Sequence, residues 1–266
     1  MPELPEVQGY RRYIEGTALH QPIRHVEVRD AHVLLDPEDQ FVQALRGRQF
    51  VGTDRIGKFL FLNHDGEGTL LMHFGMTGSP HYFRDPEDEP KFPRVIFHFE
   101  SDFALAFNCP RKFGRLQLGD SVQALATDRH LGPDAHGLSL EGFRERLASR
   151  RVNIKNALMN QCILSGLGNW MVDEILYQAR VHPEERVKDL ETDEVARIHE
   201  KMAYVIETAL EKEAHYPDFP AHFMIHSRWT DAGRPDAATL ELEKIKVGGR
   251  ATYFDPKIQV RKENPS

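Results

Sequence analysis

The first residues of the chain could supply a nucleophile. The sequence begins MPELPEV, and removal of Met1 would expose the secondary amine of Pro2. An α-amino group titrates near about 8, so a useful fraction of it is uncharged and nucleophilic at neutral pH. Such an amine can form a Schiff base with an aldehyde-level carbon, and the carboxylates of Glu3 and Glu6 lie close enough in sequence to transfer protons. Many chains begin with Met-Pro for no catalytic reason, so this pattern alone is a weak signal.

A glycine turn between two expected helices is a second candidate site. Helices are predicted over residues 154–161 and 170–179, and Gly166 and Gly168 bracket the turn between them. Backbone N–H groups at the start of the second helix could hold a phosphate, with help from the side-chain amide of Asn169. Because a glycine turn before a helix is common, spacing alone does not establish a phosphate site.

The chain is acidic overall, but its charges are unevenly distributed. The formal net charge is −7, which argues weakly against nucleic acid as a partner because phosphate binding relies on Lys and Arg. Basic residues nevertheless gather in three groups, which are Arg144, Arg146, Arg150, Arg151 and Lys155; Arg111, Lys112 and Arg115; and Arg250, Lys257, Arg261 and Lys262. This pattern fits either an ordinary solvated surface or a molecule with one cationic face.

Length and composition narrow the class of protein. A chain of 266 residues is long enough for about two domains, and 40% hydrophobic residues are typical of a globular protein. The two cysteines, Cys109 and Cys162, are too few for a disulfide framework or a cysteine-rich zinc site. His222 and His226 have helical spacing but lack two further ligands, so we predict no metal and no cofactor. Without an apolar stretch of ~18 residues or a secretory pattern at the start, we expect a cytoplasmic protein that contacts no membrane.

The first half of the chain is predicted to combine one helix with many strands. A helix is expected from Pro5 to Gly16, because Val7, Tyr10 and Ile14 fall on one face. Strands without intervening helices are expected from about residue 23 to residue 118. They include a hairpin of residues 58–63 and 70–74 and another of residues 95–99 and 104–107.

The second half is predicted to be helical until a final hairpin. Further helices are expected over residues 140–148, capped by Ser139, and 193–211, capped by Thr192. From about Phe223 the chain returns to β character, with Gly248 and Gly249 as a two-residue hairpin turn. We therefore predict an α+β fold. Its parts are an N-terminal helix plus a two-sheet β-sandwich (residues 1–128), a helical domain (129–221) and a β-hairpin (222–266).

Five blocks in a fixed order carry a resemblance to a known family. They are MPELPEV, GKFLFL around Lys58, HFGMTG around Met76, PRKFG with Arg111 and Phe113, and the segment from residue 154 to residue 183. Over nearly its whole length the chain resembles the formamidopyrimidine-DNA glycosylase and endonuclease VIII family, as a bacterial-type member. The resemblance implies that the second half contains the family's helix-two-turn-helix. Each block alone is modest, but the ordered set outweighs the acidic net charge.

The resemblance implies roles for three catalytic residues. Pro2 would form the Schiff base at C1′ of the damaged nucleotide, Glu3 would be the acid/base for opening the sugar ring, and Lys58 would bind phosphate and help elimination. The iminium acidifies the 2′ hydrogen, so the 3′ phosphate and then the 5′ phosphate can leave. Without the resemblance, Glu3 could equally cap the first helix, and Lys58 could be an ordinary charge at a strand edge.

The resemblance also implies how the chain would hold DNA. A base inside a duplex must be flipped out, and the vacated stack must be filled. Met76 and Phe113 would be the wedges, and Arg111 would contact the opposite base. Lys155 and Asn169 would hold phosphates around the flipped nucleotide, reinforced by the N–H groups after the glycine turn. Alternatively, Met76 and Phe113 would be core residues and Arg111 a surface charge.

The C-terminal segment departs from the family pattern. The family usually ends in a zinc hairpin with four cysteine ligands, but here Asp255 and Ile258 stand where the last two cysteines would be. The resemblance therefore implies a zincless finger, in which Arg250 would still enter the minor groove and grip phosphates. Packing would have to hold this geometry, and the candidate packing residues are Ile245, Val247, Tyr253 and Ile258.

The preferred lesion is left open by two further features. Leu4 favours the formamidopyrimidine branch, since glycine is common at this position in the endonuclease VIII branch. Residues 211–222, however, lack the Gly-Thr-rich loop that closes over an oxidised purine in formamidopyrimidine-type enzymes. Oxidised purines, oxidised pyrimidines, ring-opened purines and bulkier lesions are all candidates. Cys109 stands where aspartate is common, and we assign this change no meaning.

We therefore predict a bifunctional DNA glycosylase and AP lyase of base-excision repair. It would act as a monomer on damaged double-stranded DNA, and on single-stranded DNA, in association with the nucleoid. One rival is a family member that binds distorted or abasic sites without catalysis, and retention of Pro2, Glu3 and Lys58 argues against it. The other rival is a monofunctional glycosylase for bulkier lesions with feeble lyase activity. Trapping of covalent complexes with borohydride separates the three.

Overall fold

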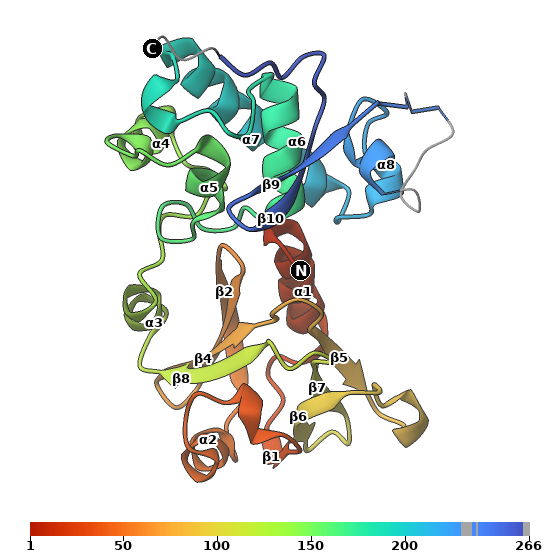
Figure 1. Ribbon diagram of the computed structural model, residues 1–266. Coiled ribbons are helices and arrows are strands. Elements are labelled where there is room, and N and C mark those ends of the chain that lie inside the picture. Colours follow the sequence, from red (N-terminus) through yellow and green to blue (C-terminus); the bar gives the residue numbers. More distant parts are fainter. Residues whose placement is uncertain (230–235, 238, 263–266) are drawn as a thin grey trace. The chain divides into compact units, whose positions relative to one another are not determined.

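The computed structural model describes residues 1–229, 236–237 and 239–262 (Figure 1). These residues form two compact units, which we call the N-terminal unit and the C-terminal unit. The N-terminal unit contains residues 1–2 and 6–130, and the C-terminal unit contains residues 3–5 and the described residues from 131 onward. The three-part division with boundaries after residues 128 and 221 stays a prediction.

The N-terminal unit contains two four-stranded antiparallel sheets. In spatial order, the first consists of β1 (Ile23–Val28), β6 (Pro93–Phe99), β7 (Ala104–Asn108) and β5 (Ser79–Phe83). The second consists of β2 (Phe50–Ile56), β3 (Phe59–His64), β4 (Gly68–His73) and β8 (Arg115–Gly119). Both predicted hairpins are confirmed, with Phe61 opposite Leu71 and Phe97 opposite Leu105.

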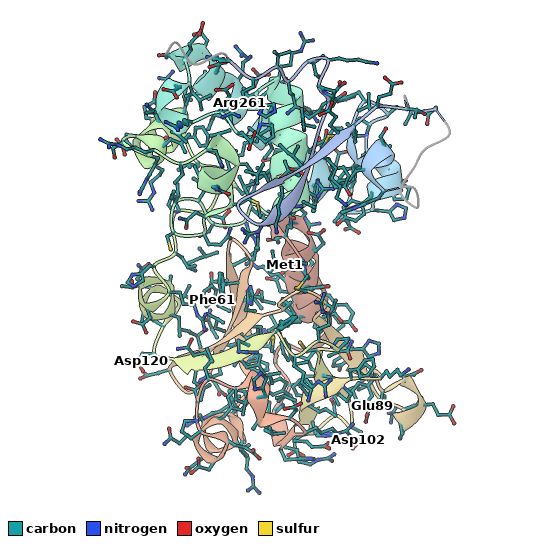
Figure 2. All side chains as sticks on the ribbon, viewed as in Figure 1. Met1, Phe61, Glu89, Asp102, Asp120 and Arg261 are labelled. Atoms are coloured by element: carbon teal, nitrogen blue, oxygen red, sulfur yellow. The ribbon has the colours of Figure 1, made fainter. Side chains whose placement is uncertain are left out.

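One apolar core lies between the two sheets. It takes Leu60 and Leu62 from β3 and Phe97 and Phe99 from β6. Successive side chains of a strand point to opposite faces, so Phe61 lies on the other face of β3; it is also fully buried (Figure 2). The strand is therefore apolar at four consecutive positions, and the predicted two-sheet sandwich is confirmed.

Helices in the first half differ from the sequence expectation. Helix α1 spans Leu4–Thr17, so it begins one residue before Pro5 and continues through Gly16. Helix α2 (Glu38–Leu45) interrupts the stretch expected to be purely β, and its buried Phe41 and Leu45 have the i, i+4 spacing of a helix face. Helix α3 (Val122–Asp128) follows the last strand and is capped by the Ser121 side chain. Short 3-10 helices cover Ala31–Val33 and Pro86–Asp88.

The C-terminal unit is helical around its own core. It contains α4 (Leu140–Leu147), α5 (Ile154–Met159), α6 (Asn169–Ala179), α7 (Thr192–Glu211) and α8 (Ile225–Arg228), with 3-10 helices at Val187–Asp189 and Tyr216–Asp218. Ser139 caps α4 as predicted, by accepting from the Gly142 N–H. Thr192 is not the cap of α7, because Glu191 and Glu194 form a capping box there. None of the described helices is both long enough and apolar enough to cross a membrane.

The final hairpin pairs β9 (Glu243–Val247) with β10 (Arg250–Phe254) beside α6 (Figure 1). Gly248 and Gly249 both have positive φ, of 55° and 80°, as a two-residue hairpin turn requires. The β character expected from Phe223 begins later, because residues 225–228 form α8. The hairpin itself is as predicted.

Candidate functional site

The carboxylate of Glu3 is held at the start of α6, within the C-terminal unit. Its oxygens accept from the backbone N–H groups of Gly168 (2.8 Å), Trp170 (3.1 Å) and Met171 (3.3 Å). The residue is 3% exposed, and a carboxylate is stabilised by the positive end of a helix dipole. The Trp170 and Met171 N–H groups, which we expected to hold a DNA phosphate, are thus occupied by Glu3. The phosphate prediction is wrong for these two groups.

The Glu3 carboxylate fills the space that a side chain at position 168 would need. A Cβ built on Gly168 would lie 2.2 Å from the carboxyl carbon of Glu3. Leu4, the residue after Glu3, also fixes the start of the chain, because its N–H donates to the Gly166 carbonyl over 3.1 Å. The start of the polypeptide is therefore anchored immediately after Pro2, which is itself partly exposed.

Lys58 lies at the two-residue turn between β2 and β3, not inside a strand. Ile56 pairs with Phe59 across this turn, and Gly57 takes the positive φ of 59° that the turn needs. Lys58 is 4% exposed, which does not fit the alternative of an ordinary charge at a strand edge. The turn places the ammonium in a partly dehydrated setting.

His73 lies in the same charged neighbourhood as Lys58 and was not predicted from the sequence. Burial, together with the nearby cations of Lys58, Arg129 and Arg115, lowers the pKa of His73 to about 4. Its ring stacks on Phe59, with 4.8 Å between the centroids. The imidazole is therefore neutral at neutral pH. Its position opposite Phe59 in the β3–β4 ladder was the available signal.

The three expected wedge and recognition residues lie on two exposed turns of the N-terminal unit. Met76 is 43% exposed and Phe113 is 51% exposed, so neither is a core residue. Arg111 is also exposed, and its Cζ lies 5.1 Å from the centroid of the Phe113 ring. Large apolar side chains in water are costly unless something covers them. This exposure is compatible with the predicted contacts to DNA, which stay a prediction.

Lys155 does not lie where the sequence prediction placed it. It is fully buried, and its Nζ lies 2.5 Å from Asp173 Oδ1 and 2.7 Å from Thr252 Oγ1. A direct contact between this ammonium and a DNA phosphate does not fit such burial. Asn169 is also engaged with the hairpin, because its Nδ2 donates to the Ala251 carbonyl over 2.9 Å.

Asp173 joins α6 to the hairpin through its second oxygen as well. Oδ2 accepts from Arg228 Nη1 (2.6 Å) and from the Tyr253 N–H (3.2 Å). We call Lys155, Asp173, Arg228 and Thr252 the buried charge cluster. The apolar packing that we expected to hold the hairpin is only partly present, since Val247 is buried but Ile258 is 37% exposed. The buried charge cluster also holds the hairpin. Asp173, a charged residue within the apolar run WMVDEILY, was the sequence signal that could have revealed this cluster.

Arg250 is exposed on β10, directly after the turn that this cluster holds. Among the described residues, no group of three or more His, Cys, Asp or Glu side chains could hold a metal ion. His226 Nε2 instead contacts the Phe219 carbonyl oxygen at 3.1 Å. The hairpin is thus attached to α6 by hydrogen bonds and ion pairs.

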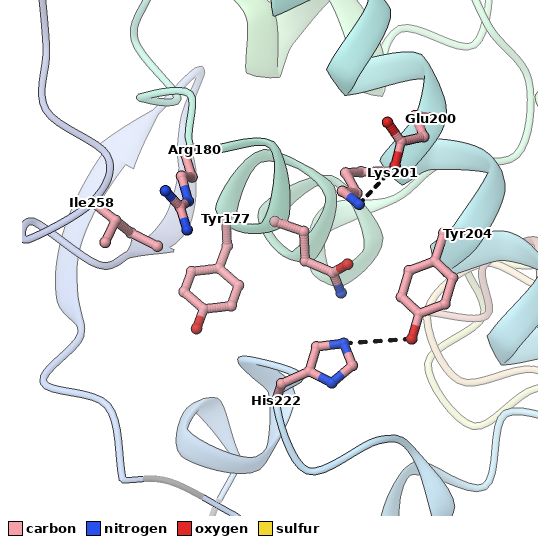
Figure 3. Close-up of a pocket in the computed structure, with 8 residues that line it drawn as sticks. Tyr177, Arg180, Glu200, Lys201, Tyr204, His222 and Ile258 are labelled. Carbon is pink, nitrogen blue, oxygen red and sulfur yellow. Dashed lines mark hydrogen bonds and ion pairs between the residues drawn. The ribbon is translucent and has the colours of Figure 1, made fainter.

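The C-terminal unit also contains an open pocket of about 430 Å³ (Figure 3). His222 Nε2 and the Tyr204 hydroxyl meet across 3.4 Å on one side of it. Its lining residues are Tyr177, Gln178, Arg180, Glu200, Lys201, Tyr204, His222 and Ile258. None of the predicted catalytic or DNA-binding residues lines this pocket.

Comparison with known proteins gives a consistent result over the whole chain. Residues 1–116 match the family model of the formamidopyrimidine-DNA glycosylase N-terminal domain, and residues 131–218 match that of the H2TH domain of the same enzymes. The formamidopyrimidine-DNA glycosylase of Ligilactobacillus salivarius is 32% identical, over 98% of this chain and 100% of that protein. That of Arabidopsis thaliana is 31% identical, over 97% and 71%.

Two solved structures extend the similarity to the fold. The Lactococcus lactis formamidopyrimidine-DNA glycosylase non-covalently bound to DNA with an AP site is 27% identical, with a TM-score of 0.84. A complex of the wild-type Lactococcus lactis enzyme with N7-benzyl-Fapy-dG DNA is 27% identical, with a TM-score of 0.83. In both cases the match covers 98% of this chain and 100% of the other.

Proposed function

Because the chain belongs to the formamidopyrimidine-DNA glycosylase family, we propose that it removes damaged bases from DNA through a Schiff base formed by Pro2. It is a DNA glycosylase of base-excision repair with AP lyase activity. The fixed carboxylate of Glu3 carries this proposal. Three N–H donors fix this carboxylate one residue after Pro2 in the chain, where it can move protons for the amine.

The chemistry at Pro2 accounts for both activities. The amine nitrogen bonds to C1′ as the bond to the base breaks, and the base leaves with the bonding electrons and takes a proton from water. The Glu3 carboxylate accepts the N–H proton of the amine and passes it to O4′ as the sugar ring opens to give the iminium. The resulting iminium draws electrons from C2′, so loss of a 2′ proton expels the 3′ phosphate by β-elimination. A second elimination expels the 5′ phosphate. Hydrolysis then returns the free amine.

Lys58 supports elimination as a cation at the leaving phosphate. Its turn fixes the ammonium in a partly dehydrated position, where a charge interacts more strongly than in bulk water. His73 is neutral beside it at neutral pH and can donate or accept a hydrogen bond without adding charge.

The exposed turns of the N-terminal unit suit the extrusion of a base. Met76 and Phe113 are the wedges that fill the vacated stack, and the guanidinium of Arg111 is a donor for the orphaned base. Burial in the stack would cover the apolar surface that these side chains expose to water. Arg250 and the Asn169 amide serve phosphates, whereas buried Lys155 acts as a positioning residue.

The substrate is damaged double-stranded DNA, and abasic single strands are accepted because the Schiff base needs only C1′. The chain works as a monomer at the bacterial nucleoid, where its substrate lies. Bulkier lesions belong to the substrate range, because residues 211–222 are short and offer no extended cover over the extruded base. Their excision would also fit the monofunctional alternative, which borohydride trapping excludes or supports.

Borohydride trapping tests the proposal directly. The wild-type chain should form a covalent complex with abasic and lesion-bearing oligonucleotides, and mass spectrometry should show Pro2 as the first residue. The variant Pro2→Leu, in which Met1 is retained, should lose trapping. The control is Pro86→Gly at an exposed proline, which should trap normally. A trapped wild-type chain that still carries Met1 would refute the assignment of the nucleophile.

A further inference from the structure

The guanidinium of Arg94 holds the turn that carries Arg111 and Phe113. We call residues 109–114, between β7 and β8, the reading turn. Arg94 of β6 donates from Nε to the Cys109 carbonyl over 2.9 Å and from Nη2 to the Pro110 carbonyl over 3.2 Å. These are the two carbonyls that immediately precede Arg111. The planar, forked guanidinium of arginine has donors spaced to bind two neighbouring acceptors, whereas the ammonium of lysine is a single point charge.

Asp30, which lies two residues after the end of β1 and caps the 3-10 helix Ala31–Val33, completes this support. Its Oδ2 accepts from Lys112 Nζ over 2.7 Å and lies 3.6 Å from Arg94 Nη1. The Asp30 N–H also donates to the Arg94 carbonyl over 3.2 Å. The Asp30 carboxylate thus links Arg94, which supports the turn, to Lys112, which directly follows Arg111. The hydrogen bond from Lys112 lowers the pKa of Asp30.

The two flanks of Arg111 are therefore fixed while its own side chain stays exposed. Lys112 adopts a left-handed conformation with φ of 56°, which the Asp30 contact helps to maintain. The side chains of Arg94 and Asp30 are only 16% and 17% exposed, so they act on the turn and not on a ligand. A turn that is fixed in advance does not lose conformational entropy on binding.

We propose that Arg94, anchored by Asp30, is a positioning residue that sets how strictly the chain discriminates the base opposite the lesion. The inference rests on the proposed function, in which Arg111 contacts that base. Arg94 acts through the reading turn by holding the Arg111 backbone in place. Loss of the fork lets Arg111 reach several bases with similar ease, and discrimination falls while the Schiff-base chemistry is kept.

The test compares Arg94→Met and Arg94→Lys with the wild type. Single-turnover excision is measured on duplexes with one lesion opposite each of the four bases, and borohydride trapping is measured on a single-stranded abasic oligonucleotide. Arg94→Met should reduce the ratio between the best and worst opposite base by about tenfold, the scale of one paired base contact. Trapping on the single strand, which has no opposite base, should stay within about twofold. Arg94→Lys should be intermediate.

The control is Arg24→Met, which removes an exposed cation paired with Asp102 at 3.4 Å in the same unit. It should leave the discrimination ratio unchanged. Asp30→Asn should repeat the effect of Arg94→Met, so the outcome does not depend on a single variant. An equal loss on all four duplexes, or an equal loss on the single strand, would show a phosphate contact or a folding role and overturn the inference.

Binding measurements keep this inference separate from the proposed function. Affinities for duplexes with a non-reactive abasic-site analogue opposite each base require no catalysis. If the wild type discriminates among these duplexes and Arg94→Met does not, the inference holds even if trapping fails. A wild type that binds all four alike would overturn the inference and leave the proposed chemistry intact.

Discussion

The backbone of Gly75 lies directly against the backbone of Phe113. A Cβ built on Gly75 would come within 2.5 Å of the Phe113 carbonyl carbon and 2.6 Å of the Gly114 nitrogen. Gly75 also has φ of 60°, a left-handed conformation that favours glycine. Since Met76 follows Gly75, the turn with Met76 and the turn with Phe113 are set against each other through one position without a side chain.

Gly75→Ala should therefore separate the two wedges. The added methyl group meets backbone atoms that cannot move alone, so we expect a larger loss of stability than left-handed strain gives. Gly47→Ala is the matched control, because Gly47 has φ of 74° and nothing within 4 Å of an added Cβ. Strain alone should cost it about 1 kcal/mol. Chemical denaturation and duplex excision measure both effects, and equal losses in the two variants would contradict the contact.

Gly168→Ala should displace the Glu3 carboxylate, to which we assign the proton transfer. The added Cβ would collide with the Glu3 carboxyl carbon, so this group must leave its three N–H donors. We expect borohydride trapping to fall by about 10²–10⁴-fold, the range for loss of a general acid or base. Glu3→Gln keeps an acceptor oxygen but cannot transfer the proton, so it should lose activity with a smaller change in stability.

The control for Gly168→Ala is Gly16→Ala within α1, where nothing lies within 4 Å of an added Cβ. Alanine is the better helix former, so this variant should be as active as the wild type and up to ~1 kcal/mol more stable. If Gly168→Ala traps normally, Glu3 does not act from the start of α6.

Local patterns were enough to predict most elements of the fold. The hairpin of β3 and β4 follows from two apolar runs around a polar turn, and Ser139 is a capping residue next to a helical period. Helix α2 was missed because eight residues between strands offer little more than two turns of helical spacing. Its Phe41 and Leu45 gain their meaning only from the core they enter.

The candidate site also combines features that could be predicted from the sequence with features that depend on contacts between distant parts of the chain. The exposure of Met76 and Phe113 agrees with what the resemblance implied, but sequence alone left a core position equally open. The burial of Lys155 could not be read locally, because its partners lie 18 and 97 residues away in the chain. Arg94 was not singled out either, since its fork reaches Cys109 only through the pairing of β6 with β7.

The buried charge cluster predicts a hairpin that needs no metal. Asp173→Asn leaves the Lys155 ammonium buried without its countercharge, so the free energy of unfolding should fall by about 3–5 kcal/mol. Lys155→Met should cost less, because Asp173 keeps Arg228 and the Tyr253 N–H. Hydrogen exchange of residues 243–254 should report the loosened hairpin in both variants.

Two controls accompany the cluster variants. Lys257→Met removes an exposed ion pair with Glu241 (2.7 Å) in the same segment and should leave the stability unchanged, because water screens such a pair. A metal chelator should leave wild-type excision unchanged. Loss of activity on chelation, or normal exchange protection in Asp173→Asn, would show that something else holds the hairpin.

Glu174 predicts a pH dependence of stability with a definite sign. Burial raises its pKa to about 7 from 4.5, although the N–H groups of Met224 and Ile225 donate to the carboxylate. Between these two pKa values the folded chain holds a proton that the unfolded chain has lost. The contribution of Glu174 to stability is therefore complete below about 4.5 and declines as pH rises to about 7, by up to ~3 kcal/mol.

Glu174→Gln isolates this contribution, because the amide is similar in shape and does not titrate. Other groups titrate in the same range. His73, with its pKa lowered to about 4, makes stability rise with pH between about 4 and 6.5. The informative quantity is hence the difference in unfolding free energy between wild type and variant at each pH. That difference should shift in favour of the variant as pH rises, whereas Glu141→Gln on the exposed face of α4 should give a flat difference. Parallel profiles for wild type and Glu174→Gln would show that the carboxyl titrates as it does in the unfolded chain.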